Sequence, residues 1–277
     1  MYRFIDYLNA HREYYVTRKT APASTKDVRR DYHPHYEVYF CPLDSEQRTV
    51  INGEPLTINQ SAVIISAPFS VHGMSKYSES ESFLRYTVYV TEEFLEKCAE
   101  MLPDGMFHSR ASCVYLLDEG TKEKIHRLFS AMVEAEAYPK EFYSYFSATM
   151  NTLERSVPTD MRHRGEKEEC YYITEVLEYI YENKHRSVSA DEIVDAFHVS
   201  RAKLDRDFKD FVGDTLHSAI TKFRAGYAVK LLNETNMRVR DVAKACGFEN
   251  EYYFFAFFKR TLGKTPLSIR KEAKAQR

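Results

Sequence analysis

Three histidines and one glutamate in the N-terminal half have the types and spacing of groups that bind metal ions or polar ligands. His33, His35 and Glu37 occur at every second position, so their side chains share one face if this segment is a strand. His72 follows a loop that contains Pro68. Imidazole and carboxylate groups are ligands for first-row transition metals. The same groups also line polar pockets or lie hydrogen-bonded at a surface, so the residues by themselves leave these interpretations open.

A second unusual segment is YYFFAFFKRTLGKTP at 252–266, which is aromatic on more than one side of a helix. Phe254, Phe257 and Phe258 have the spacing of a core face, with Tyr253 flanking them. A helix whose other side is also aromatic turns that side toward an interface of some kind. That other side carries Tyr252, Phe255, Ala256 and Lys259.

The composition is that of an ordinary folded protein. The chain has 277 residues, 44% of them apolar and 29% charged, which is enough for two domains and excludes wholesale disorder. The longest apolar runs, such as 62–65, are too short to cross a bilayer, and the start lacks the layout of a signal peptide. The five cysteines include no CxxC pair, so no disulfide framework or structural zinc site is predicted. We expect a cytoplasmic protein that does not bind membranes.

The N-terminal half has the pattern of short β-strands. Asn52-Gly53 predicts a tight hairpin, because both residues tolerate a positive φ. Several strands at this spacing predict a sandwich or a small barrel. Runs rich in Val, Ile, Tyr and Phe occur at 37–41, 49–51, 62–66, 84–90 and 113–117.

Helical periodicity replaces the strand pattern after residue 120. Apolar residues recur at helical spacing on either side of Pro139, which predicts a helical hairpin over 121–156. The polar segment 157–169 has no apolar period and is the predicted linker. A helix, a tight turn and a helix, occurring twice, form an arrangement that reads DNA, because a helix fits the major groove. The further predicted helices are 174–184, 189–197, 200–213, 216–235, 238–248 and 251–263, with Ser189 and Glu192 as a capping box.

Positive charge is concentrated at the C-terminal end. Residues 220–277 contain thirteen Lys and Arg against five Asp and Glu, whereas the whole chain has a formal charge of −2. A local basic field is typical of a nucleic-acid-binding surface, although a solvated helix surface has the same composition.

Residues 188–272 resemble the double helix-turn-helix domain of the AraC/XylS family of transcriptional regulators. The N-terminal half is similar, more loosely, to the cupin-type barrel of the family's ligand-responsive members, through HPHYEVYF and PFSVH. His198 stands where the first unit's turn usually has glycine, and histidine tolerates the left-handed conformation better than most residues. The motifs that carry the main resemblance are VAKACGF (242–248), Tyr253-Phe254, Phe258-Lys259-Arg260, Gly263, Thr265-Pro266 and Arg270, with Arg224, Ala228 and Leu231-Leu232 in the central helix.

The resemblance implies which side chains face DNA. Asp205 can accept from cytosine and Arg206 can read guanine, so the first unit is expected to carry the hydrogen-bonded readout. Family members commonly have an arginine where this chain has Ala256, so the second unit is expected mainly to dock and to favour A·T-rich sequence. The alternative for Phe255 is packing against a neighbouring helix or subunit. The predicted base-reading residues are Arg201, Ala202, Asp205, Arg206, Glu251, Tyr252, Phe255 and Ala256, and the predicted phosphate contacts are Lys184, Lys222, Lys230, Lys259 and Arg270.

The cupin resemblance implies a polar pocket without a metal. In cupins the glutamate usually lies farther beyond the second histidine than Glu37 does, and regulatory members mostly bind small organic ligands. We therefore expect no metal and no cofactor. The predicted ligand-binding residues, for a sugar or a similar polar effector, are His33, His35, Glu37, Tyr39, His72 and Arg85, with tyrosine as simple strand filler as the alternative.

These patterns and the family resemblance together predict an α+β chain of two domains. They are a cupin-like β-barrel over 1–120 with a helical hairpin over 121–156 that contributes to dimerisation, and, after a linker over 157–169, an all-α double helix-turn-helix domain over 170–277. We predict a regulator and not an enzyme: a homodimer that binds specific double-stranded DNA, responds to a small-molecule effector and contacts RNA polymerase. The alternatives are a metal-dependent cupin enzyme, and an interaction protein whose second reading helix has lost base readout.

Overall fold

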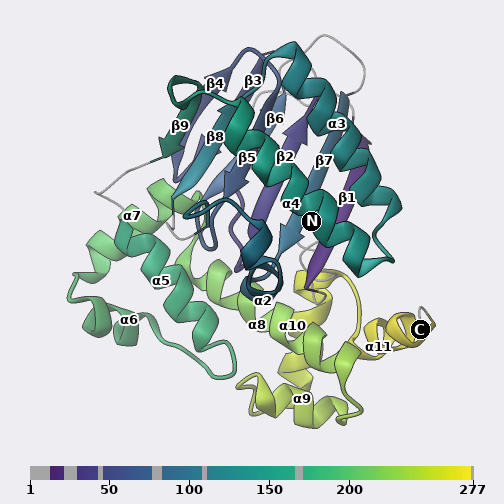
Figure 1. Cartoon of the computed structure of the whole chain (residues 1–277). Coiled ribbons are helices and arrows are strands. Elements are labelled where there is room, and N and C mark those ends of the chain that lie inside the picture. The colour runs from purple at the N-terminus through teal and green to yellow at the C-terminus, as the bar shows by residue number, and fades with distance from the viewer. Residues whose placement is uncertain are drawn as a thin grey trace. The chain divides into compact units, whose positions relative to one another are not determined.

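The computed structural model describes residues 13–21, 30–42, 46–76, 83–107, 111–165 and 171–275 (Figure 1). These residues fall into two compact units, one within 13–165 and the other within 171–275. Among the described residues, no helix has both the length and the apolar character needed to cross a membrane. The thiols of Cys41, Cys98 and Cys246 are buried, Cys113 is half-buried, and Cys170 lies outside the described residues.

The N-terminal unit is built on two antiparallel β-sheets. Its strands are β1 (Tyr14–Ala21), β2 (Tyr36–Cys41), β3 (Gln47–Ile51), β4 (Glu54–Ile58), β5 (Ala62–Ser66), β6 (His72–Lys76), β7 (Phe83–Val90), β8 (Ser112–Leu116) and β9 (Arg162–Gly165). One sheet has six strands in the order β1-β7-β2-β5-β8-β9, and the other has three in the order β4-β3-β6. The described strands thus form two sheets and do not show a closed barrel.

Five of these strands follow from the sequence, and the hairpin is confirmed. β2, β3, β5, β7 and β8 coincide with the predicted runs to within two residues at either end. Asn52 and Gly53 join β3 to β4 with φ angles of 50° and 78°, as a tight two-residue turn requires. β9 lies inside the predicted linker and pairs with β8, while residues 166–169 of that linker lie outside the described residues.

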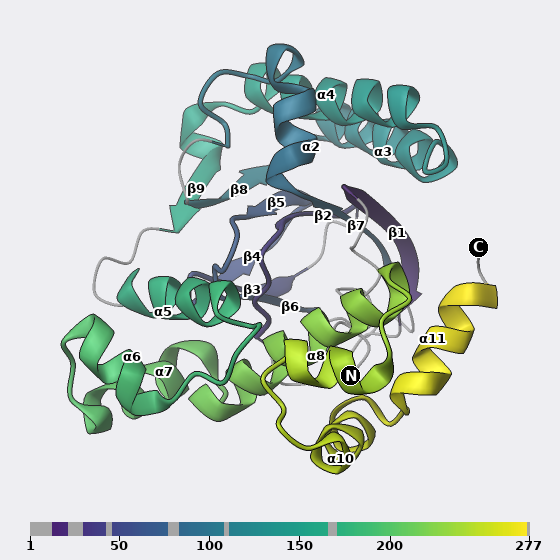
Figure 2. The same cartoon turned by 90° about the horizontal axis from the view of Figure 1, so that it is seen from below.

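Helices cover one face of the six-stranded sheet and the smaller sheet lies on the other (Figure 2). The helices of this unit are α2 (Glu92–Lys97), α3 (Glu119–Glu134) and α4 (Pro139–Ser156), with short 3₁₀ turns η1 (Ala99–Met101) and η2 (Thr159–Met161). Pro139 starts α4, because the first turn of a helix does not need its N–H. α3 and α4 form the predicted hairpin, and Phe129 and Phe146 are among the side chains that they bury against the sheet.

Strand β2 lies in the middle of this arrangement, and all six of its residues are buried. Successive side chains of a strand point to opposite faces. Val38 and Phe40 pack in the core beneath the helices, whereas Tyr39 and Cys41 belong to a second cluster shared with the three-stranded sheet. By the same alternation Glu37 points to the side of the smaller sheet.

The C-terminal unit is all helical. It comprises α5 (Tyr171–Glu182), α6 (Ala190–Phe197), α7 (Arg201–Val212), α8 (Leu216–Glu234), α9 (Val239–Ala245), α10 (Glu251–Leu262) and α11 (Pro266–Ala275). The pairs α6–α7 and α9–α10 are helix-turn-helix units, and the long helix α8 joins them (Figure 1). The predicted helices are confirmed, and α11 is an element that the sequence did not predict.

The turns of this unit show why the local sequence folds as it does. His198 ends α6 with a φ of 52°, which confirms the expected left-handed position, and Gly247 has a φ of 73°, which suits glycine. Ser189 caps α6 by accepting from the N–H of Glu192 at 3.1 Å. The reciprocal half of the predicted capping box is wrong, because the carboxylate of Glu192 binds Arg186 and Tyr179 instead.

Candidate nucleic-acid interface and buried histidine cluster

The predicted base-reading residues of the first helix-turn-helix unit lie on the exposed side of α7. Ser200 precedes the helix, and its hydroxyl accepts a hydrogen bond from the N–H of Lys203 at 3.2 Å. Leu204 and Phe208, one turn apart, are fully buried and hold the opposite side of α7 against the core. The side that remains exposed includes Arg201, Ala202, Asp205 and Arg206.

The charges on this side of α7 are paired with one another. Arg201 donates from Nε to Oδ2 of Asp205 at 2.7 Å, and Arg206 donates from Nη2 to Asp207 at 3.1 Å. Contacts of Asp207, first among them the one with Lys203, lower the pKa of its carboxyl to about 2. Exposed pairs of this kind contribute only about 0–1 kcal/mol, so a base or phosphate can replace the acidic partner at little cost.

The aromatic helix α10 buries one side, as its spacing predicts. Asn250 caps it by accepting from the N–H of Tyr252 at 2.8 Å. Phe254, Phe257 and Phe258 are 0%, 7% and 0% exposed and pack in the core of the second helix-turn-helix unit, which confirms the predicted core face.

The other side of α10 is less uniformly exposed than expected. Glu251, Tyr252 and Ala256 are exposed, whereas Phe255 is half-buried and packs against the same core. Tyr253 was expected to flank the core, but its side chain is 67% exposed. A helix of 3.6 residues per turn places Tyr253 about 100° from Phe254, beyond the edge of the buried stripe. The exposed aromatic pair is therefore Tyr252 and Tyr253, with ring centroids 6.0 Å apart.

The five predicted phosphate-binding cations have different surroundings. Lys230 and Lys259 are exposed. Lys222 lies 2.9 Å from the carboxylate of Asp214. Lys184 is half-buried over the ring of Tyr181, at 3.6 Å from its centroid, and burial lowers the pKa of this lysine. Arg270 is also half-buried, and its Nε donates to the carbonyl of Leu232 near the end of α8 at 3.4 Å.

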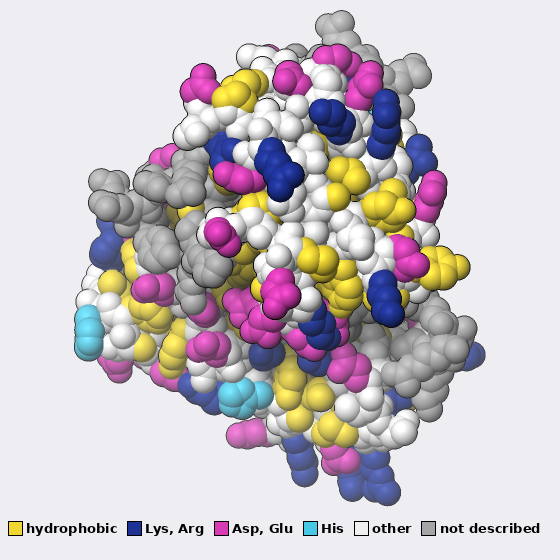
Figure 3. Space-filling view, viewed as in Figure 1, with side chains coloured by type: hydrophobic (Ala, Val, Ile, Leu, Met, Phe, Trp, Pro, Cys, Tyr) yellow, Lys and Arg dark blue, Asp and Glu magenta, His cyan; other side chains and the backbone are white. Residues whose placement is uncertain are grey.

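Basic side chains project from the surface in the region of α9 (Figure 3). Arg238, Arg240 and Lys244, which lie on and before this helix and were not among the predicted contacts, are exposed. The basic composition of the C-terminal segment was the signal that pointed to them, but composition does not say which cations share a surface.

Arg224 is a structural residue that sequence reasoning noted only through the family spacing. From α8 it donates to the carbonyls of Cys246 and Gly247 at 2.9 and 3.1 Å, and its guanidinium lies 4.0 Å from the centroid of the Phe248 ring. It thereby satisfies carbonyls that the end of α9 leaves without a helical partner. Arg224 holds the turn that leads into α10.

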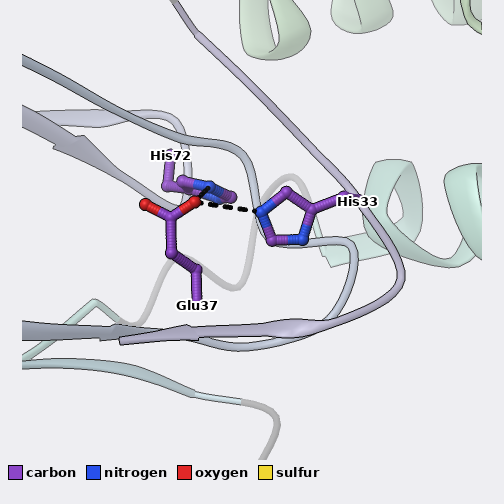
Figure 4. A group of neighbouring side chains, drawn as sticks. All are labelled: His33, Glu37 and His72. Carbon is purple, nitrogen blue, oxygen red and sulfur yellow. Dashed lines mark hydrogen bonds and ion pairs between the residues drawn. The ribbon is translucent and has the colours of Figure 1, made fainter. Parts of the chain in front are cut away.

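Three of the predicted sensor residues come together between the two sheets (Figure 4). Glu37 comes from β2, His72 from the start of β6, and His33 from the segment before β2. Nε2 of His33 is 3.2 Å and Nε2 of His72 is 3.4 Å from the same oxygen of Glu37, Oε2. His33, Glu37 and His72 are 3%, 4% and 3% exposed. Burial by itself lowers the pKa of His72. The charge and hydrogen bond of Glu37, the charge of Asp31 and the hydrogen bond to Ser70 together outweigh burial, so the pKa is raised.

The remaining predicted sensor residues do not join this cluster. β2 begins only at Tyr36, so the predicted alternation of His33, His35 and Glu37 along one strand is wrong. The ring of His35 is half-buried, with its centroid 6.2 Å from that of His33. Tyr39 pairs with Thr87 across the sheet, so Tyr39 and Arg85 lie on the same face as Glu37, farther along the strands.

Comparisons with known proteins concern mainly the helical unit. The family profile described as a helix-turn-helix domain matches residues 193–272. The xylose operon regulatory protein of Escherichia coli is 29% identical over 98 residues, which are 35% of this chain and 25% of that protein. The chain thus spans about a quarter of the length of the xylose operon regulatory proteins that it matches. The HTH-type transcriptional activator RhaS of Enterobacter sp. is 23% identical over 230 residues, or 80% of each chain.

The probable transcription factor PqrA of Proteus vulgaris is 31% identical over 100 residues, which are 35% of this chain and 82% of PqrA. The chain belongs to the AraC family of transcriptional regulators. Members of the AraC family bind DNA. In this AraC-family chain, the matched segment 193–272 contains both α7 and α10 as well as Arg224, whereas the cluster of His33, Glu37 and His72 lies outside it.

Proposed function

We propose that this AraC-family chain is a sequence-specific DNA-binding transcriptional regulator whose N-terminal unit responds to a small polar effector. The observation that carries the proposal is the pair of capped helices α7 and α10, each buried on one side and exposed on the side that bears the predicted reading residues. A helix with one free side is what the major groove admits. The helix-turn-helix arrangement occurs twice in one unit, so α7 and α10 contact two segments of the same duplex.

The two helices contribute differently to recognition. α7 offers Arg201, Asp205 and Arg206, whose donors and acceptors match base edges in the major groove. α10 offers Tyr252 and Tyr253 as exposed aromatic surface, which packs on thymine methyl groups and gives no bidentate contact. Hydrogen-bonded specificity therefore resides mainly in α7, and α10 mainly docks.

The N-terminal unit is proposed as a cupin-type sensor. The proposal is supported by polar side chains on the face of the six-stranded sheet that is turned toward the three-stranded sheet. They include Glu37, Tyr39 and Arg85. One relative regulates a xylose operon by its name, which makes a sugar a reasonable first effector to test. We also propose a homodimer through α3 and α4, because Tyr138 and Tyr145 are 60% and 36% exposed on that hairpin. Contact with RNA polymerase stays a prediction.

The deciding experiment measures binding of the full chain to DNA from upstream of its own gene and to the same DNA scrambled. Each is titrated at two salt concentrations, because the phosphate contribution falls with salt and a base contribution persists. We expect selective binding that Arg206→Ala weakens by about 1–3 kcal/mol for the selected DNA but much less for the scrambled DNA. Equal affinity for both DNAs at every salt concentration, with and without xylose, would refute the proposal.

A second function is favoured by the exposed pair of Tyr252 and Tyr253. Such a pair also suits a protein-docking surface, in which α10 binds a partner in place of bases. The variant Tyr252→Ala/Tyr253→Ala separates the two functions. Loss of DNA affinity at unchanged stability supports docking on DNA, whereas unchanged DNA binding supports the interaction surface.

A further inference from the structure

The buried cluster of His33, Glu37 and His72 has a hydrogen-bonding pattern that fixes both imidazole tautomers. Nδ1 of His33 lies 3.1 Å from the carbonyl oxygen of His35, and Nδ1 of His72 lies 2.9 Å from that of Ser70. A carbonyl oxygen only accepts, so each Nδ1 carries the hydrogen. In the neutral rings each Nε2 atom then has no hydrogen and can act only as an acceptor, through its lone pair.

Both lone pairs point at a third acceptor. The Nε2 atoms of His33 and His72 converge on Oε2 of Glu37, and one such atom from each of the three residues lies within 4.8 Å of the others. Nε2 of His72 has no hydrogen-bond partner among the described residues, although it is 3.4 Å from the carboxylate oxygen. A buried polar atom without a partner is costly, so three acceptors facing one another call for a positive charge between them.

A proton on one imidazole meets this need only partly. It places one N–H between one ring and Glu37, and the Nε2 of the other ring still lacks a donor. A metal ion accepts a lone pair from all three groups at once. Nε2 of His33 and Nε2 of His72 lie 3.2 and 3.4 Å from Oε2 of Glu37. Neighbouring ligand atoms around a tetrahedral ion with bonds of about 2.0–2.1 Å lie about 3.3 Å apart, so these distances fit such an ion.

The ligand set also selects the kind of ion. Two imidazoles with one carboxylate suit first-row transition metals, whereas magnesium and calcium prefer oxygen ligands throughout. A backbone carbonyl that accepts from the distal ring nitrogen is the usual support of a metal-binding histidine, and both rings have one. The strands hold these groups in place, because the backbone of Asp31 pairs with that of His72 and brings the segment before β2 against β6.

We propose that His33, Glu37 and His72 bind one divalent first-row transition-metal ion in the N-terminal unit, through Nε2 of each histidine and the carboxylate. This goes beyond the proposed function, since neither DNA binding nor an organic effector requires it. It also reverses the expectation from sequence, which counted His35 among the candidates and found Glu37 too near. In the structure His35 contributes its backbone carbonyl, and Glu37 reaches the cluster because, as the second residue of β2, it points to the side of the smaller sheet.

The test is titration of the untagged, EDTA-treated full chain with Co²⁺, followed by the visible d–d absorption of the ion. We expect saturation at one Co²⁺ per chain, displacement by Zn²⁺ and no displacement by excess Mg²⁺. Thermal denaturation should show a higher Tm with Co²⁺ or Zn²⁺ than without. X-ray absorption of the wild-type complex should show nitrogen and oxygen ligands and no sulfur, which excludes the cysteines as the binding groups.

Two variants remove ligands and two serve as controls. His72→Ala and Glu37→Gln should each weaken Co²⁺ binding by at least about 100-fold, because even outer-shell changes cost about 10–100-fold. His35→Ala and His217→Ala, the second an exposed histidine of the helical unit, should leave the affinity unchanged. Absence of saturable Co²⁺ binding, equal competition by Mg²⁺, or sulfur ligands would overturn the proposal. If His72→Ala does not fold by circular dichroism, Glu37→Gln and the X-ray absorption of the wild type decide it.

Discussion

Arg201 donates to the carboxylate of Asp205 one turn later on α7, with 2.7 Å between Nε and Oδ2. Both side chains are about half exposed, so the pair is readily opened. In the proposed function Asp205 therefore has two roles: its charge repels phosphate, and its carboxylate holds Arg201 in one orientation. Each role leads to a measurable change when the carboxylate is removed.

We predict that Asp205→Ala raises the affinity for scrambled DNA and reduces selectivity. Removing the acid frees Arg201 for a phosphate, so the slope of log affinity against log salt should steepen by about one charge. Discrimination at the base pair that Asp205 reads should fall by about 1–3 kcal/mol. The charge-matched control is Asp195→Ala, which removes an exposed acid from α6. Identical effects of the two variants on selectivity would show that Asp205 does not read a base.

Phe255 and Tyr252 should differ in what their removal changes. Phe255 is half-buried against the core, so Phe255→Ala should lower the free energy of unfolding by about 1–3 kcal/mol, less than a fully buried phenylalanine. Tyr252 is 74% exposed, and Tyr252→Ala should change stability by less than about 0.5 kcal/mol while weakening DNA binding. Urea denaturation and DNA titration of both variants check this. A stable Phe255→Ala chain with altered base preference would show that Phe255 acts on DNA after all.

Gly247 should not tolerate even alanine. Its φ is 73°, and a Cβ there would lie 2.7 Å from the backbone nitrogen of Ser187, which precedes α6. Backbone cannot move aside as a flexible side chain does, so Gly247→Ala should destabilise the helical unit by about 3 kcal/mol or more, the left-handed strain of about 1–2 kcal/mol included.

Gly105 provides the matched control for that experiment. Its φ is 74°, but a Cβ there meets nothing within 4 Å. Gly105→Ala should therefore cost only the conformational strain, about 1–2 kcal/mol. Urea denaturation of both variants, followed by circular dichroism, compares them. Equal losses would mean that the contact with Ser187 is not what Gly247 is needed for.

The stability of the fold below about pH 4.5 should depend on Glu192. Arg186 first, and then the hydroxyl of Tyr179 at 2.6 Å, lower the pKa of Glu192 from 4.5 to about 2. A depressed carboxyl pKa stabilises the fold above about pH 4.5, and this contribution is lost as the pH falls toward about 2.

Glu192→Gln should consequently lower the stability at pH 7 by about 0.5–1 kcal/mol and flatten its decline between pH 4.5 and 2. Urea denaturation at a series of pH values measures both. Glu175→Gln, at an exposed position of α5, is the control and should leave the profile as in the wild type. A Glu192→Gln profile that runs parallel to the wild type would contradict the assignment.

Much of the fold follows from the sequence because its signals are local. The helices of the second unit have caps and apolar periods, and strands such as β2 and β5 are continuous apolar runs. The strands that the sequence did not predict include β6 (HGMSK) and β9 (RHRG), which lack such runs. Their pairing depends on neighbouring strands, which a window of sequence does not contain. α11 was not predicted, although it begins at Pro266 and proline suits a first helical turn.

The candidate sites show the same division between local and long-range information. The exposed side of α7 was expected from the family resemblance, and the buried spacing of Leu204 and Phe208 agrees with it. The cluster of His33, Glu37 and His72 could not be expected in this way, because it depends on a bridge between Asp31 and His72 and on where β2 begins. Residue types in the sequence indicated His33, Glu37 and His72 as candidates. That His33 and not His35 joins the cluster through its side chain is shown only by the structure.

The close approach of Gly247 to Ser187, together with the bonds from Arg224 to the same turn, ties the two helix-turn-helix units into one piece. If α7 and α10 bind DNA as proposed, the protein then fixes the spacing of the two DNA segments that they contact. One extra base pair inserted between those segments turns the second by about 34° around the duplex axis. A single insertion in the operator should therefore disrupt the contacts of one helix, and only an insertion near a full turn of the duplex should return that segment to the same side of the axis.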